Sequence, residues 1–190
     1  MGVIVLAGGR SERMGQDKAL LTRGGRTLLE QTLLTVSEIS SEIIVVADRA
    51  DRYPLAIGRG IADRFPGAGP LGGVITGLEL LGEGNHLVTA CDMPSLQTSV
   101  LRYLLSCANE EADCVVPLVG GRLEPLCAVY QQSALVPLRA YFEEGERALH
   151  RSLRRLRLRT VPEEELRAFD PELRCFRNLN TPEEAAEWIS

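Results

Sequence analysis

The chain has 190 residues, of which 45% are hydrophobic and 25% are charged, a balance typical of one globular domain. Its formal net charge of −5 excludes the broadly basic surface that binds nucleic acid by its phosphates. No segment approaches the roughly 18 unbroken apolar residues of a membrane span, and the apolar start lacks the basic lead of a signal peptide. We therefore expect a cytoplasmic protein with no nucleic-acid partner and no membrane partner.

Short apolar runs, bounded by turn residues, alternate along the chain with segments of helical periodicity. Buried strands are predicted at residues 3–7, 43–47, 87–90 and 114–118. Helices are predicted between them, at residues 28–39, 71–81 and 96–108. Repeated strand–helix–strand units predict a mostly parallel sheet, and continuous apolar strands predict that helices cover both of its faces.

The last third of the chain is less regular. A further strand is predicted at residues 126–130 and a helix at residues 133–143. The final helix has a clear start, with Thr181 as its N-cap, Pro182 at the first helical position and acidic residues in the first turn. No repeat or low-complexity linker divides the sequence. We predict one α/β domain over residues 1–190, with three layers and a mostly parallel, Rossmann-like sheet.

Neither the cysteines nor the histidines form a metal-binding pattern. The five cysteines include no CxxC pair, and the two histidines, His86 and His150, lie far apart in the sequence. Reduced, mostly buried thiols are therefore expected, and a zinc site is not.

The most informative segment is the loop directly after the first predicted strand. Gly8 and Gly9 permit positive φ angles and a close approach of the backbone, so that successive N–H groups can bind an anion. Arg13 and Lys18 can add charge-assisted hydrogen bonds to phosphate oxygens. Ligands of open α/β sheets bind at the carboxyl ends of the strands, where this loop begins. The loop is therefore predicted to bind phosphate; a glycine loop without function is the alternative reading.

Two better-known phosphate motifs do not account for this loop. The pattern GxxxxGK[ST] is absent, because Gln16 follows Gly15. The pattern GxGxxG does occur at residues 67–72, but it follows Asp63-Arg64-Phe65-Pro66 instead of a buried strand. It also lies far from the first strand–helix turn, which excludes a dinucleotide-binding fingerprint.

Asp92 follows another predicted strand and should lie at the same edge of the sheet. One carboxylate, together with phosphate oxygens and water, is the usual way for a protein to hold Mg²⁺. Pro94 stiffens the turn that follows. From the pattern alone Asp92 can also cap a helix, and Asp63 can be an ordinary loop aspartate.

Five segments of the chain, in order, resemble the motifs of one family. They are residues 6–18, which match LAGGxSxRMGxDK, and Gly69-Pro70-Leu71-Gly72-Gly73, Cys91-Asp92-Met93-Pro94, Glu124-Pro125-Leu126 through Tyr130, and Phe176 through Glu183, which match GPLAG, CDxP, EPLxAxY and FxNxNTPE. In this order the segments are similar to the molybdenum cofactor guanylyltransferases of the nucleotidyltransferase superfamily. One motif residue departs, since Gly72 replaces the usual alanine.

The resemblance implies the fold of the nucleotide-diphospho-sugar transferases, with GTP, molybdopterin and Mg²⁺ as ligands. It implies base and ribose contacts at Leu6, Ala7 and Gly8, with Gly9 in the same loop. Phosphate contacts are implied at Lys18, a contact to the guanosine side at Asp63, and Mg²⁺ binding at Asp92. The family often has an asparagine after its second strand that touches the nucleotide. Here that stretch reads Ala47-Asp48-Arg49, so this contact is not assigned.

Three further residues are candidates for binding the second substrate. By the resemblance they are Glu124, Asn178 and Asn180, and the asparagines are also candidates for assisting the metal. Capping of the final helix is an equally good reading of the asparagines.

A run of arginines near the C-terminus has two readings. Leu149, Leu153 and Leu156 fall on one helical stripe, which favours the run as the solvated face of a helix. The alternative is a landing surface for an anionic pterin phosphate or a partner protein. The run consists of Arg147, Arg151, Arg154, Arg155, Arg157 and Arg159.

The resulting hypothesis is that the terminal phosphate of molybdopterin attacks the α-phosphorus of GTP and that pyrophosphate leaves. A phosphate monoester is largely dianionic at neutral pH, with a second pKa of about 6, so no strong general base is needed. Arg13, Lys18 and Asp92 are the expected catalytic residues, acting by positioning and charge neutralisation. Molybdoenzyme maturation proteins are further candidate partners.

Two alternatives remain open from the sequence. The nearer one is the same chemistry on another substrate, as in a molybdopterin cytidylyltransferase or a sugar-1-phosphate nucleotidyltransferase. Gly8-Gly9 favours guanine, because the cytidine relatives typically have Ala-Ala-Gly in this loop. The other alternative is an adaptor that binds nucleotide and molybdopterin without turnover.

Overall fold

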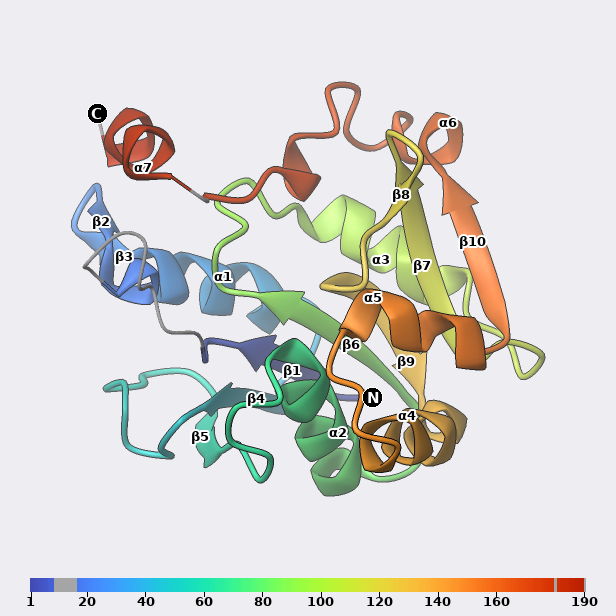
Figure 1. Ribbon diagram of the computed structural model, residues 1–190. Helices are drawn as coiled ribbons and strands as arrows, with labels where there is room; N and C mark the ends of the chain where they lie inside the picture. The colour runs from blue at the N-terminus through green and yellow to red at the C-terminus, as the bar shows by residue number, and fades with distance from the viewer. Residues whose placement is uncertain (9–16, 180, 190) are drawn as a thin grey trace.

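An eight-stranded sheet forms the centre of the computed structural model, which describes residues 1–8, 17–179 and 181–189 (Figure 1). The strand order is β10-β7-β9-β6-β1-β4-β5, with β8 paired to β7. β9 runs antiparallel to both of its neighbours and β8 to β7, while the other described pairs in this sheet are parallel. The strands are β1 Val3–Leu6, β4 Ile43–Ala47, β5 Arg59–Ala62, β6 Asn85–Ala90, β7 Cys114–Val119, β8 Arg122–Leu123, β9 Cys127–Gln131 and β10 Leu158–Pro162.

Helices cover both faces of this sheet and bury one core on each side. One core packs α1, α3 and α6 against one face, and the other packs α2, α4 and α5 against the opposite face. This is the three-layer, mostly parallel arrangement expected from the sequence. The helices are α1 Leu28–Ser37, α2 Pro70–Leu81, α3 Thr98–Ser106, α4 Leu135–Glu143, α5 Leu149–Ser152, α6 Glu163–Leu166 and α7 Pro182–Ile189, with short 3-10 turns η1 Lys18–Leu20, η2 Gln132–Ala134, η3 Leu153–Arg155 and η4 Arg174–Phe176. No helix in the described ranges is long and apolar enough to cross a membrane.

The helix starts follow from local hydrogen bonding. The Thr27 hydroxyl accepts from Glu30 N, and the Glu30 carboxylate accepts from Thr27 N, which closes a capping box at the start of α1. Thr181 and Glu184 form the same reciprocal pair at the start of α7, so the predicted N-cap is confirmed. The final helix is therefore capped by Thr181.

The C-terminal segment crosses back to the beginning of the chain. Leu179, Ala185 and Trp188 form a small apolar cluster with Leu21 and Leu28. Figure 1 shows α7 beside the hairpin of β2 Thr22–Arg23 and β3 Arg26–Thr27. Leu179 in this segment also accepts a hydrogen bond from Lys18.

Three parts of the sheet were missed by the sequence prediction. β5 reads Arg-Gly-Ile-Ala and is partly exposed, because it is an edge strand with no continuous apolar run. The second missed element is β8. It is joined to β7 by Gly120 and Gly121, whose φ angles of 55° and 73° suit a two-residue hairpin turn. A Gly-Gly pair between extended segments is a signal that predicts such a hairpin. The third missed element is β10, at the other edge of the sheet.

The prediction of one arginine-lined helical face near the C-terminus is wrong beyond Leu156. Leu149, Leu153 and Leu156 are buried in one core, as the stripe predicted. The helical turns end at Arg155, however, and Arg159 lies within β10. Three of these arginines form ion pairs within the protein, which are Arg155–Glu144, Arg157–Asp113 and Arg159–Glu165.

Asp113 ties the edge strand β10 to the rest of the sheet. Its carboxylate accepts from the Arg157 backbone N–H at 2.9 Å, from the Arg157 guanidinium at 2.6 and 3.1 Å, and from the Ser133 hydroxyl at 2.6 Å. These bonds, with Arg157 foremost, lower the pKa of Asp113 from 3.8 to about 2. The ionised carboxylate thus links the starts of β7 and β10.

Replacing this carboxylate should destabilise the fold in a pH-dependent way. Asp113→Asn should lower the free energy of unfolding by about 1–3 kcal/mol at pH 7, because charged hydrogen bonds are lost. A lowered folded-state pKa adds stability that is present above the ordinary pKa of 3.8 and is lost as the pH falls towards about 2. Urea unfolding at stepped pH should therefore show the two proteins converging below about pH 4. A pH-independent difference would contradict this account; Asp51→Asn, at a side chain 85% exposed, is the matched control.

Candidate active site

Two adjoining cavities open at the carboxyl ends of the central parallel strands. The larger has a volume of about 670 Å³ and the smaller of about 200 Å³. Both are lined by Leu6, Gly8 and Pro70, so the loop after β1 and the start of α2 form their common wall. Ligand binding is predicted from the sequence at this same edge of the sheet.

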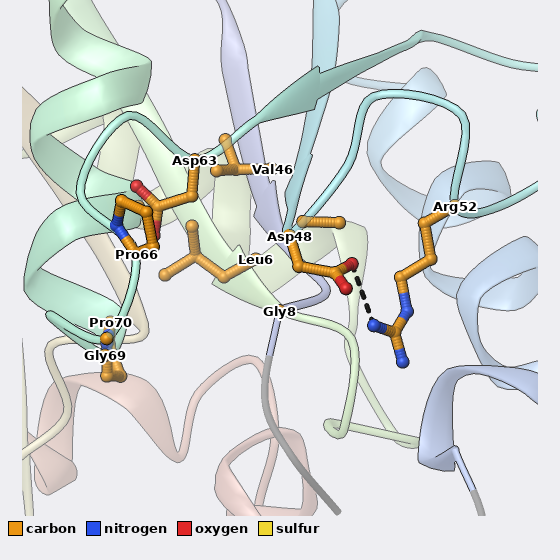
Figure 2. Close-up of a pocket in the computed structure, with 12 residues that line it drawn as sticks. Leu6, Gly8, Val46, Asp48, Arg52, Asp63, Pro66, Gly69 and Pro70 are labelled. Carbon is orange, nitrogen blue, oxygen red and sulfur yellow. Dashed lines mark ion pairs between the residues drawn. The ribbon is translucent and has the colours of Figure 1, made fainter.

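The walls of the larger cavity come from the loops after β4 and β5. Figure 2 shows Asp63, Pro66, Gly69 and Pro70 on one side of Leu6, with Asp48 and Arg52 on the other. The Arg52 guanidinium and the Asp48 carboxylate form an ion pair of 2.8 Å at this wall (Figure 2). Residues 47–49, to which the sequence assigned no contact, thus place a carboxylate at the cavity.

Asp63 is held in a fixed orientation at this cavity. Its backbone N–H donates to Ala47 O at 2.7 Å, and its Oδ1 accepts from Phe65 N at 2.9 Å and from the Thr76 hydroxyl at 3.0 Å. These bonds tie the turn before α2 to the helix itself. Asp63 therefore shapes the cavity wall as well as lining it.

A glycine lets α2 pack close to β1 with the Leu6 side chain in its present position. A Cβ on Gly73 would lie 2.7 Å from Leu6 Cδ2, nearer than side chains tolerate. Gly73 therefore lets the start of α2 lie directly against Leu6, and it lines the larger cavity. This contact gives a physical reason for the last glycine of the Gly69-Pro70-Leu71-Gly72-Gly73 segment.

The smaller cavity brings Lys18 and Asp92 together. Lys18 Nζ lies 3.9 Å from Asp92 Oδ2, and it also donates a hydrogen bond to Leu179 O. The side chains are 19% and 26% exposed, so both can be reached from the cavity. Burial raises the pKa of Asp92, whereas the Lys18 ammonium and a backbone hydrogen bond act in the opposite direction.

The C-terminal segment contacts both charged residues of this cavity, because Leu179 hydrogen-bonds with Asp92 and with Lys18. Leu179 N donates to Asp92 O at 2.9 Å, and Asn178 directly precedes it. The side-chain oxygen of Asn178 is buried and has no hydrogen-bond partner among the described residues. Such an oxygen is a ready ligand for a cation or a substrate N–H or O–H group.

The other predicted residues fall into two groups. Ala7 lines the smaller cavity. Glu124 is half-buried at the end of β8, two residues before Leu126, which lines that cavity; burial raises the pKa of Glu124, and Arg122 opposes this. Gly9, Arg13 and Asn180 lie outside the residues that the structure describes.

Several residues at the site were missed by the sequence prediction. Asp48 and Arg52 line the larger cavity and Asp17 lines the smaller one, while Tyr53 contacts both Asp17 and Ala7. Each is a common residue type in an irregular loop, so its position depends on tertiary structure. A local signal exists only for Asp17, which accepts from Ala19 N and caps η1.

Comparison with known proteins now identifies the family. A family model described as the MobA-like NTP transferase domain matches residues 3–161. The chain belongs to this family. It is 41% identical over 155 residues to a probable molybdenum cofactor guanylyltransferase of Chloroflexus aggregans, covering 78% of this chain and 74% of the relative. It is 31% identical over 151 residues to a protein of the same description from Bacillus cereus, covering 77% and 76%.

Solved structures agree with this assignment. Molybdopterin-guanine dinucleotide biosynthesis protein A of Archaeoglobus fulgidus superimposes with a TM-score of 0.86 at 30% identity, over 100% of this chain and 97% of that one. A 2-C-methyl-D-erythritol 4-phosphate cytidylyltransferase of Thermus thermophilus gives a TM-score of 0.69 at 22% identity, over 99% and 97%, which shows the fold alone. The predicted nucleotide-diphospho-sugar transferase fold is confirmed, and this MobA-like chain is a nucleotidyltransferase.

Lys18 offers a direct test of where the phosphates bind. Lys18→Ala should weaken binding of a nucleoside triphosphate by about 1.5–3 kcal/mol, because one charge-assisted hydrogen bond is lost. Diphosphate and monophosphate binding should weaken less, since the proposed partner is a distal phosphate. Calorimetry with the three nucleotides gives the comparison, and Arg155→Ala, at an ion pair with Glu144, is the control. Equal weakening for all three nucleotides would remove Lys18 from the distal phosphates.

Proposed function

We propose that this chain transfers GMP from GTP to the terminal phosphate of molybdopterin, forming the guanine dinucleotide cofactor and pyrophosphate. The observation that carries the proposal is the pair of adjoining cavities, one for a nucleoside and one lined by Lys18 and Asp92. Both open at the edge of the sheet where α/β proteins bind nucleotides. The guanylyltransferase description of relatives at 31–41% identity supports this choice of substrates.

The larger cavity suits a guanosine. Gly8, Gly67 and Gly69 bring bare backbone to its wall, so that N–H and C=O groups can approach a purine edge. Asp48 and Asp63 add carboxylates, which accept hydrogen bonds from the N–H groups of guanine or from ribose hydroxyls. The smaller cavity then receives the phosphates, with Lys18 as a point charge beside them.

The reaction needs positioning more than proton transfer. A phosphate monoester, with a second pKa of about 6, is already largely dianionic at neutral pH and can attack the α-phosphorus without a general base. One P–O bond forms to the acceptor phosphate, the bond to the β-phosphate breaks, and pyrophosphate leaves with the electron pair. Lys18 orients the triphosphate and neutralises part of its charge; Arg13, outside the described residues, is proposed to do the same.

The donor set at the smaller cavity fits Mg²⁺. Asp92 supplies a partly exposed carboxylate. Asn178 directly precedes Leu179, which donates to Asp92 O, and its side-chain oxygen lacks a partner among the described residues. Mg²⁺ usually takes one or two carboxylates with substrate phosphates and water, so no larger cluster of protein ligands is required. When bound, the ion would offset negative charge that develops on the α-phosphate and on pyrophosphate. We propose that Asp92 holds it and that Asn178 and Asn180 assist.

Binding of the acceptor is proposed for the other side of the smaller cavity. Glu124 lies on the segment between β8 and β9, and Asn178 lies on the segment that contacts Asp92 O through Leu179. The segment with Glu124 reaches this cavity at Leu126, which lines it, and the segment with Asn178 contacts Asp92 and Lys18 through Leu179. A cytoplasmic location is supported by the GTP substrate and by five free cysteines. Transfer of the product to a molybdoenzyme maturation protein is also proposed.

The choice of base tests this function most simply. GTP should bind at least tenfold more tightly than CTP, a difference of about 1.4 kcal/mol, and only GTP should give product efficiently with molybdopterin. The physical reason is the glycine-lined wall that admits a purine. Calorimetry with four nucleoside triphosphates, followed by product formation with molybdopterin, makes the measurement. Preferred use of CTP would make the chain a cytidylyltransferase, and binding without turnover would make it an adaptor.

Replacing Asp92 tests its proposed role in holding Mg²⁺. Asp92→Asn keeps the shape of the side chain but removes the charge that would hold Mg²⁺, so turnover should fall on the order of a thousandfold. GTP affinity should fall less, because Lys18 and the loop backbone remain. Single-turnover product formation at saturating Mg²⁺ and GTP, beside a thermal melt, makes the comparison, with Asp51→Asn as the control. Normal turnover would remove the metal assignment from Asp92, and a collapsed melting temperature would favour a structural role.

A further inference from the structure

Ala7 and Asp17, which lie on either side of residues 9–16, are joined by a side chain from another part of the chain. Tyr53 Oη lies 2.9 Å from Ala7 O, before residues 9–16, and 3.0 Å from Asp17 Oδ2, after them. Tyr53 is 6% exposed, and its hydroxyl proton is shared between these acceptors. The Tyr53 ring belongs to the core that packs α1, α3 and α6 against one face of the sheet.

Arg52 holds the same aspartate from a second direction. Its Nη2 and Nε donate to Asp17 Oδ2 at 2.7 and 3.2 Å, and its Nη1 pairs with Asp48 at 2.8 Å. A guanidinium that bridges two carboxylates is held in one orientation. Asp17 completes the network by accepting from Ala19 N at 3.1 Å, which caps the turn that contains Lys18.

This network also sets the charge that faces the incoming nucleotide. Asp17 lines the smaller cavity and Asp48 the larger one, so two carboxylates border the path of a polyanionic triphosphate. Arg52 lies between them and pairs with both, which reduces their repulsion of the phosphates.

We propose that Arg52 and Tyr53 are positioning residues for nucleotidyl transfer. Tyr53 bridges Asp17 and Ala7, and Arg52 holds Asp17, so that Lys18 and the Ala7 backbone are placed to receive the triphosphate. The inference rests on the proposed function, because it assigns these residues to the nucleotide site. It differs from a purely structural role in one respect. The Tyr53 hydroxyl should affect triphosphate affinity only when Lys18 is present.

The test is a double-mutant cycle on GTP affinity, measured by calorimetry. Tyr53→Phe removes only the hydroxyl and should weaken GTP binding about tenfold. In the Lys18→Ala background the same change should have little further effect, because the residue that it positions is already gone. Tyr103→Phe, which removes another hydroxyl bonded to a carboxylate, is the matched control and should leave GTP affinity unchanged.

Variants of Arg52 provide a second test of the positioning role. Arg52→Gln should weaken GTP binding more than Tyr53→Phe, because it also leaves two carboxylates unpaired, and Arg52→Lys should restore part of the loss. Thermal melts show the folded fraction, so that affinities are compared for folded protein only.

The outcomes separate the two proposals. Wild-type GTP binding with an unchanged affinity in Tyr53→Phe would overturn the positioning role alone. An equal loss of affinity from Tyr53→Phe with and without Lys18 would also overturn it, since the hydroxyl would then act independently of Lys18. A wild-type chain that binds no nucleoside triphosphate would overturn the proposed function together with this inference.

Discussion

The common register of three parallel strands, β4, β1 and β6, is the constraint on which the site depends. Leu6 pairs with Val46 on one side and with Ala90 on the other, so the three strands end at one level. Ala7 N donates to Val46 O and Cys91 N to Leu6 O, which continues the pairing one residue further. The residues that follow the three strands therefore leave the sheet together, and they include Gly8, Asp48 and Asp92. Both cavities lie at this edge of the sheet, as do the ion pairs Arg52–Asp48 and Lys18–Asp92.

The central strands could be predicted from the sequence because burial on both faces leaves a continuous apolar run. The edges of the sheet could not, since β5 and β10 are partly exposed and carry arginines. In β10, Arg159 belonged to the arginine run that suggested a helical face, and it instead pairs with Glu165. Periodicity alone does not distinguish a short helix followed by an edge strand from one longer helix.

The candidate site divides in the same way. Residues that leave the strands directly, such as Gly8 and Asp92, are predictable because topology alone places them at one edge. Arg52 and Tyr53 are not, because they come from an irregular loop and act through long-range contacts with Asp17. Asn178 was singled out by its motif, but only the fold shows that Leu179 carries this segment to Asp92 and Lys18. A motif thus names the residues, and the tertiary contacts show which of them meet.

A triphosphate bound beside Lys18 should shield this side chain from reagents, and Lys18 is the only lysine of the sequence. An amine-acylating reagent can therefore modify only this side chain and the N-terminal amine. The rate of acylation at each position can be followed by mass spectrometry with and without GTP and Mg²⁺. We expect GTP to slow acylation of Lys18 several-fold and to leave the rate at the N-terminal amine unchanged. Equal acylation of Lys18 in both conditions, at a GTP concentration that saturates binding, would contradict it.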